Sequence, residues 1–112
     1  MNNFNHQLNM KHSYIVKTTV ADTILFVTND YSQIIPEFLK KINIDMEKWN
    51  NMVEYLNPKP CDKQEYWRIH HNNLSTPHRM EFPGPDLMKV GDRYVLFGYS
   101  QETFVVDVIS SV

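Results

Sequence analysis

The most constraining feature of the sequence is a pair of dense β-forming runs near its end, Arg93–Tyr99 and Thr103–Ile109. Both runs are rich in β-branched and aromatic residues, which suit a pleated and buried surface. A polar connection separates them, and Gly98 permits a bend or bulge just before it. Because successive side chains point to opposite faces and both faces are mainly apolar, the runs predict a hairpin inside a sheet.

A second pair of β-forming segments lies near the start of the chain. Residues Ser13–Val20 alternate in character and predict a strand with one wetter face. Residues Thr23–Thr28 form a continuous apolar run, which predicts a central strand covered on both faces. The short polar break at Ala21-Asp22 joins the two segments, so we expect an antiparallel hairpin.

Apolar residues recur at helical spacing in two stretches between these hairpins. The first, Ile34–Ile42, places Pro36 in the first turn, where a missing N–H is tolerated. The second begins after Asp45, a good N-cap, and its apolar stripe continues to Leu56. The segment Asn57–Pro60 contains two prolines and ends this second predicted helix.

The segment Tyr66–His71 predicts one further strand, to which His78–Phe82 could add a partner strand and Leu87–Val90 a short extended piece. The predicted order is then β-β-α-α-β-β-β, with strands at both ends and the helices together in the middle. Such segregation favours an α+β fold over an alternating α/β fold. We therefore expect an antiparallel sheet of about five or six strands with two helices packed on one face.

The size and composition indicate one domain. The chain has 112 residues with an apolar fraction of 42%, enough for a single hydrophobic core. Residues 13–112 are predicted to form that α+β domain. Residues 1–12 are polar and Asn-rich, so they are predicted to form a flexible N-terminal arm.

Charge and cysteine content exclude several classes of function. The net charge of -2 has both signs interspersed, so direct nucleic-acid binding is not expected. A single cysteine, Cys61, excludes an intramolecular disulfide and fits a reducing compartment. The sequence shows neither a secretory signal nor the run of roughly 18 apolar residues that a membrane span needs. We expect a cytoplasmic protein with no membrane contact, no metal and no cofactor.

One short motif offers an enzymatic alternative. The stretch His70-His71-Asn72-Asn73 resembles the HNH nuclease motif, but the resemblance is short and lacks the second group of metal ligands. Adjacent histidines on a strand also point to opposite faces, which hinders joint binding of one ion. This alternative is a small metal- or histidine-dependent hydrolase or nuclease that uses His70, His71 and His78.

The same region is rich in the residue types that dominate binding interfaces. Trp, Tyr and Arg combine a large contact area with directional polar groups. The predicted partner-binding residues are Glu65, Tyr66, Trp67, Arg68, His70, His71, Arg79 and Glu81. Acidic residues surround them and would complement a basic partner.

These features together predict a non-enzymatic protein-binding domain. Because the sequence contains no catalytic motif, the class of protein that fits it best by analogy is a bacterial inhibitor or immunity protein. Such a protein would neutralise a basic toxin, for example a nuclease, by covering its active site with carboxylates in place of substrate phosphates. It would be a monomer or a weak dimer. A third hypothesis is a homo-oligomeric structural subunit that pairs through an exposed strand.

Overall fold

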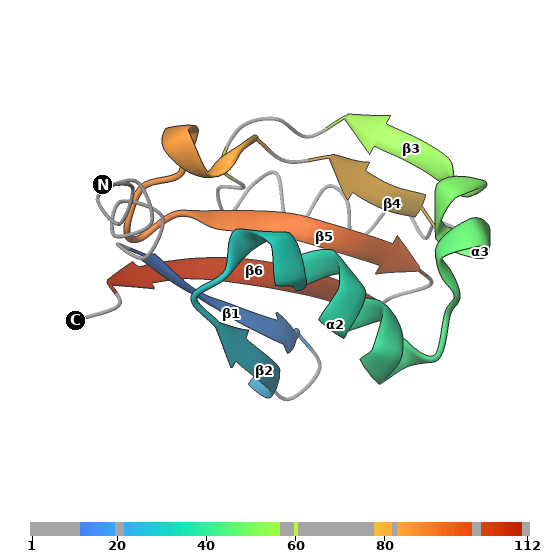
Figure 1. The fold of residues 1–112 in the computed structure, drawn as a ribbon, viewed down its shortest axis with the longest axis horizontal. Helices are drawn as coiled ribbons and strands as arrows, with labels where there is room; N and C mark the ends of the chain where they lie inside the picture. The colour runs from blue at the N-terminus through green and yellow to red at the C-terminus, as the bar shows by residue number, and fades with distance from the viewer. Residues whose placement is uncertain are drawn as a thin grey trace, which may run out of the picture.

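The computed structural model describes residues 12–19, 22–56, 60, 78–81, 83–99 and 102–110. Within them, six strands form one sheet in the order β2-β1-β6-β5-β4-β3, and helix α2 lies across one face of it (Figure 1). The strands are β1 His12–Thr18, β2 Thr23–Thr28, β3 Val53–Leu56, β4 His78–Glu81, β5 Arg93–Tyr99 and β6 Glu102–Ser110. The helices are α2 Ile34–Ile42 and α3 Met46–Asn50, with short 3-10 turns η2 Tyr31–Gln33 and η3 Pro85–Leu87. The α+β class predicted from the sequence is confirmed.

The C-terminal hairpin occupies the interior of the sheet, as predicted. Strand β6 pairs antiparallel with β1 on one side and with β5 on the other. Val95, Val105 and Val106 are fully buried, which explains why both faces of these runs are apolar in the sequence. The expected bend near Gly98 takes the form of a register shift between Val95 and Phe97.

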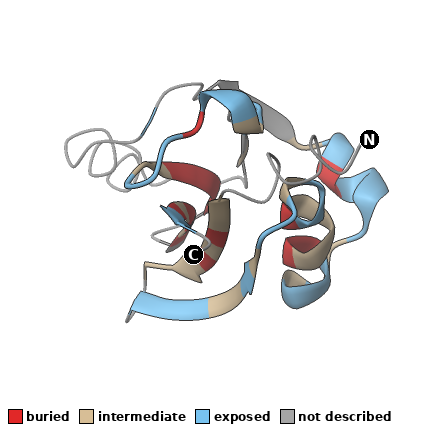
Figure 2. Cartoon of the chain, turned by 60° about the vertical axis from the view of Figure 1, so that its left-hand side comes forward, coloured by how far each residue is buried: buried red, intermediate tan, exposed pale blue. Residues whose placement is uncertain are grey.

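The hydrophobic core lies between the sheet and the helices. We call the helix-covered side of the sheet the inner face and the opposite side the outer face. Figure 2 shows buried residues on the sheet and on helical turns, while exposed residues lie toward the outside. The buried core cluster consists of Tyr14, Val16, Ile34, Phe38, Leu39, Trp49, Met88, Tyr94, Leu96, Phe97, Val106 and Val108.

An aromatic cluster joins the helices to the sheet. The ring centroid of Phe38 on α2 lies 5.2 Å from that of Phe104 and 5.8 Å from that of Phe97. Trp49 on α3 packs 6.1 Å from the rings of both Phe38 and Phe97. These separations are typical of favourable aromatic pairs, so the cluster fixes both helices on the inner face.

The N-terminal hairpin forms as predicted, but its second strand does not lie in the middle of the sheet. Strand β2 pairs antiparallel with β1 and is a terminal strand of the described sheet. The side chains of Ile24 and Val27 are each 55% exposed, so the prediction of a doubly covered central strand is wrong. A run of apolar residues specifies a strand without specifying how many neighbours it will have.

Helix α2 agrees with its sequence prediction. Ile34, Phe38 and Leu39 are buried on its sheet-facing side. The helix ends at Asn43, which adopts the left-handed conformation (φ 58°) and donates its backbone N–H to the carbonyls of Leu39 and Lys40. Asn is one of the few residues other than Gly that take this conformation readily.

The second predicted helix is too long. Asp45 caps it as expected, with the Lys48 N–H donating to its carboxylate at 2.7 Å, but α3 ends at Asn50. The residues Val53–Leu56 instead form β3, which pairs in parallel with β4. The apolar stripe fitted a helix and a strand equally well over this short stretch, and the long-range pairing with β4 selected the strand. The sheet is therefore mixed rather than antiparallel as predicted, and β3 takes the place along the chain where the second half of that helix was predicted.

The remaining predictions have mixed outcomes. The predicted strand His78–Phe82 corresponds to β4. The predicted extended segment Leu87–Val90 does not form a strand: Leu87 ends η3 and Val90 begins a turn, although the backbone of Met88 between them is extended. The predicted strand Tyr66–His71 lies outside the described residues. His12 belongs to β1 rather than to an N-terminal arm, and residues 1–11 are outside the description. None of the helices in the described ranges has the length and hydrophobicity to cross a membrane.

Candidate binding face

The outer face of the sheet is organised in rows that cross four strands. Residues paired directly opposite each other point to the same face. One row runs through Val27, Ile15, Asp107 and Arg93, from β2 to β5. The neighbouring rows consist of Ile24, Lys17, Val105 and Val95, and of Ser13 with Ile109.

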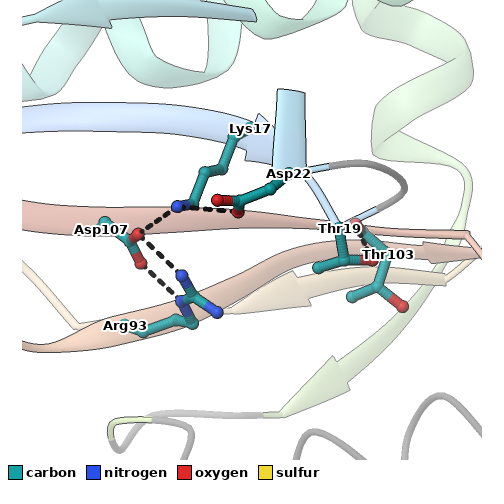
Figure 3. A network of polar contacts seen from close by, with 6 residues as sticks. All are labelled: Lys17, Thr19, Asp22, Arg93, Thr103 and Asp107. Atoms are coloured by element: carbon teal, nitrogen blue, oxygen red, sulfur yellow. Dashed lines mark hydrogen bonds and ion pairs between the residues drawn. The ribbon is translucent and has the colours of Figure 1, made fainter. Parts of the chain in front are cut away.

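The polar centre of this face is an ion-pair network around Asp107 (Figure 3). Arg93 binds the Asp107 carboxylate in a bidentate manner, with Nε 2.6 Å from Oδ1 and Nη2 2.8 Å from Oδ2. The Lys17 Nζ lies 3.2 Å from Asp107 Oδ2 and 3.0 Å from Asp22 Oδ1. One carboxylate thus links the three strands β1, β5 and β6, and Lys17 extends the network to the β1–β2 turn.

The electrostatics of the network favour the charged forms of Asp107 and Lys17. Burial alone would raise the pKa of Asp107, but hydrogen bonding and charge from Arg93, and then from Lys17, outweigh it and lower that pKa. The hydrogen bond to Asp22 is the largest influence on Lys17 and raises the pKa of its ammonium group, against the opposing effect of burial. Bidentate pairing with Arg also fixes the orientation of the carboxylate.

A polar contact next to this network extends the pairing of β1 and β6. The Thr19 hydroxyl and backbone N–H both donate to the Thr103 carbonyl, at 3.1 and 3.0 Å (Figure 3). Asp22 lies in the turn that follows, with a left-handed backbone (φ 51°) and its side chain 76% exposed. This turn therefore presents a carboxylate to solvent at a position that Lys17 helps to define.

Exposed and half-buried branched residues lie around the ion pairs on the β2 side of the outer face. We define the outer-face patch as Ile15, Ile24, Val27 and Ile109. Ile24 and Val27 are 55% exposed, and Ile109 is 37% exposed. Farther along the same face, Val95 and Val105 are completely buried. Apolar exposure on this face is thus concentrated toward β2, β1 and the end of β6.

The chemistry of the outer face suits binding better than proton transfer. A carboxylate whose pKa is lowered by two cations is a poor general base, and an ammonium whose pKa is raised is a poor nucleophile. The combination of branched apolar side chains, an arginine and a fixed carboxylate is instead typical of contact surfaces. Within the described ranges, the structure contains no group of three His, Cys, Asp or Glu side chains arranged to hold a metal ion.

A concave surface lies between α2 and α3. This shallow hollow of about 450 Å³ is lined by Pro36, Leu39, Lys40, Asn43, Ile44, Asp45 and Met46. The Asp45 carboxylate is used to cap α3, and the Lys40 ammonium lies 3.4 Å from Glu37. The polar groups at its rim are thus engaged within the fold, and we base no function on this hollow.

Only part of the site predicted from the sequence falls within the described residues. The residues Glu65, Tyr66, Trp67, Arg68, His70 and His71 lie outside them. Arg79 is half-buried on β4 opposite Phe97, and Glu81 is exposed at the end of the same strand. His78 begins β4 opposite Gly98. Strand β4 is separated from β1 by β5 and β6, so Arg79 and Glu81 do not join the outer-face patch.

The sequence analysis did not select the residues of the ion-pair network. Lys17 and Asp107 are single charges within β-forming runs, Arg93 begins such a run and Asp22 lies in a polar break, so each resembles an ordinary solvent-facing position. The residue that could have revealed the network is Asp107. It shares a face of its strand with Val105 and Ile109, so its carboxylate requires a positively charged side chain as a partner if that face is covered. The identity of that partner depends on strand register.

The chain was also compared with protein-family models, with curated proteins and with solved structures, and none of the three comparisons found a match. Its function is therefore inferred from its own residues, of which the outer-face patch and the ion-pair network carry most information.

Proposed function

We propose that the protein is a non-enzymatic protein-binding domain of the inhibitor or immunity type. It would neutralise a basic toxin, such as a nuclease, by covering the active site of that toxin. The proposed place of action is the bacterial cytoplasm, a reducing compartment in keeping with a single cysteine that forms no intramolecular disulfide. The proposed binding surface is the outer-face patch together with Asp22 and Arg93.

The observation that carries the proposal is the exposure of branched apolar residues around a rigid ion-pair network. Ile24, Val27 and Ile109 expose between 37% and 55% of their surface on one face. An interface needs such an apolar centre, surrounded by polar groups that exclude water and set orientation. Because the underlying sheet is held by Asp107 and its two cations, little ordering would be required on binding.

The proposed mechanism is steric and electrostatic. The apolar patch would pack against the rim of the active site, while exposed carboxylates contact the cations that normally hold substrate phosphates. Asp22 is suited to this role because its carboxylate is largely exposed and is positioned by Lys17. Glu81, one of the residues predicted from sequence, is exposed on β4 but lies outside the outer-face patch and takes no part in this surface.

Affinity capture from the native host tests the proposal. Tagged protein should retain one stoichiometric basic protein, identified by mass spectrometry. The variants Asp22→Lys and Ile109→Lys should each lower that recovery by at least about tenfold, because one reverses a contact charge and the other places a charge in the apolar centre. Lys41→Glu on the exposed side of α2 is the matched control and should keep the partner.

A purified partner then permits a direct test of inhibition. Equimolar wild-type protein should abolish the toxic activity, whereas the Asp22→Lys variant should leave most of it. Capture that is equally strong with both outer-face variants would refute the proposed surface. An eluate without any stoichiometric protein would refute the proposed function. The histidine-dependent hydrolase or nuclease would then be the next hypothesis. Enzymatic assays of the double variant His71→Ala/His78→Ala test it, because the double change should abolish such an activity.

A further inference from the structure

We propose that two copies of this chain pair through the edges of their β2 strands to form a weak, symmetric dimer. Strand β2 pairs only with β1 among the described strands and terminates the sheet on that side (Figure 1). The outer edge of such a strand presents a row of backbone N–H and C=O groups that can pair with another strand. A two-fold axis perpendicular to the sheet would place the two β2 strands antiparallel.

The sequence of β2 lacks the charges and the proline that protect many exposed edges. Natural edge strands carry lysines, prolines or inward-pointing charges that prevent edge-to-edge pairing. The six residues of β2, TILFVT, include no charge and no proline. A register shift opposite Val16 and Lys17 is the one irregularity in its pairing with β1, and it places both Ile24 and Val27 on the outer face.

Charge favours a second copy as the occupant of this edge. In a symmetric antiparallel pair every charge on β2 is repeated on the partner strand, so a charged edge would bring like charges close together near the axis. An uncharged strand avoids that repulsion. The nearest charge at its start, Asp22, is compensated by the Lys17 ammonium 3.0 Å away. At its other end, the Asp30 carboxylate accepts hydrogen bonds from the backbone N–H and hydroxyl of Ser32.

The size of the contact predicts a weak association. Six extended residues provide an edge of about 20 Å. The exposed side chains of Ile24 and Val27, two from each copy, would add to this contact. The total buried area would still be below the roughly 1,200 Å² that stable complexes bury. We therefore expect a dissociation constant on the order of micromolar. Pairing would also join the two outer faces into one continuous surface. The dimer does not depend on the proposed toxin partner.

Sedimentation equilibrium over a wide concentration range tests this inference. The wild-type mass should rise from that of a monomer to that of a dimer between about 1 and about 500 μM. The double variants Ile24→Lys/Val27→Lys and Ile24→Glu/Val27→Glu should each remain monomeric because like charges meet at the axis. An equimolar mixture of the two should regain the dimer mass, since opposite charges then face each other.

Two controls separate this result from misfolding and from partner binding. Both substituted positions are more than half exposed, so the circular dichroism spectrum of each variant should match that of wild type. Ile109→Lys lies on the outer face away from the β2 edge and should leave the dimer intact while it impairs capture of a toxin. A wild-type protein that stays monomeric at every concentration would overturn the inference. Dimerisation that survives both double variants would do the same.

Discussion

Asp107 is the residue that ties the outer face together. Its side chain is only 20% exposed, and a carboxylate at such a position is costly unless it is paired. The bidentate contact with Arg93 and the contact with Lys17 supply that pairing from the two neighbouring strands. The cluster stabilises the fold because removal of the acid would take from Arg93 the carboxylate that it binds in a bidentate manner and would leave Lys17 with the exposed carboxylate of Asp22.

The variant Asp107→Asn should lower the free energy of unfolding at pH 7 by about 2 kcal/mol. Urea unfolding followed by circular dichroism measures this difference. Asp86→Asn, at an exposed position in η3, is the matched control and should change stability by less than about 0.5 kcal/mol. Equal losses in the two variants would contradict the importance assigned to the network.

The advantage of wild type over Asp107→Asn should also disappear in acid. The folded state holds the pKa of Asp107 below the unfolded value of about 3.9. A lowered carboxyl pKa stabilises the fold at pH values above the unfolded pKa. That stabilisation is lost as the pH falls through the folded-state pKa. Unfolding curves of both proteins between about pH 7 and pH 2 should therefore converge at the acid end, and a constant difference would exclude this assignment.

At the scale of elements, helix α3 and strand β3 show how local signals compete. Asp45 begins α3 as the sequence predicts, because an Asp at the N-cap can accept the free N–H of the first turn. The end of α3 was not predictable in the same way. Val53–Leu56 leaves the helical pattern because β4, distant in the sequence, offers a parallel partner. Local capping chemistry is visible in a sequence, whereas a distant pairing strand is not.

The variant Asp45→Ala should reduce the free energy of unfolding by about 1 kcal/mol, because the Lys48 N–H loses its acceptor. Asp45→Asn keeps a side-chain oxygen at the same position and should cost only a few tenths of that amount. Denaturant unfolding of both variants provides the comparison. If Asn were as destabilising as Ala, the carboxylate charge rather than the cap would be responsible.

At the scale of the whole molecule, the aromatic cluster decides stability. Phe38 is fully buried and contacts the rings of Trp49, Phe97 and Phe104, so it connects α2 to α3, β5 and β6. A single hydrophobic core in a chain of 112 residues provides only about 5–15 kcal/mol of net stability. Loss of one large ring in this cluster is therefore a substantial fraction of the total.

The variant Phe38→Ala should lose about 4 kcal/mol of stability, and its melting temperature should fall by roughly 15–20 °C. Phe38→Leu should lose much less, because leucine refills most of the vacated volume. Thermal unfolding measured by circular dichroism tests both. Leu87→Ala, at a side chain that is 71% exposed, should leave the melting temperature nearly unchanged.

The sequence alone determined the elements that depend on neighbours along the chain. The strands β1, β2, β5 and β6, the helix α2 and the cap of α3 all follow from local periodicity, β-branched content or capping residues. The tertiary structure alone decided that β2 lies at the edge, that β3 pairs in parallel, and that Lys17, Arg93 and Asp107 meet. These outcomes depend on which distant strands pair and in which register, because only the assembled sheet determines which side chains are buried together.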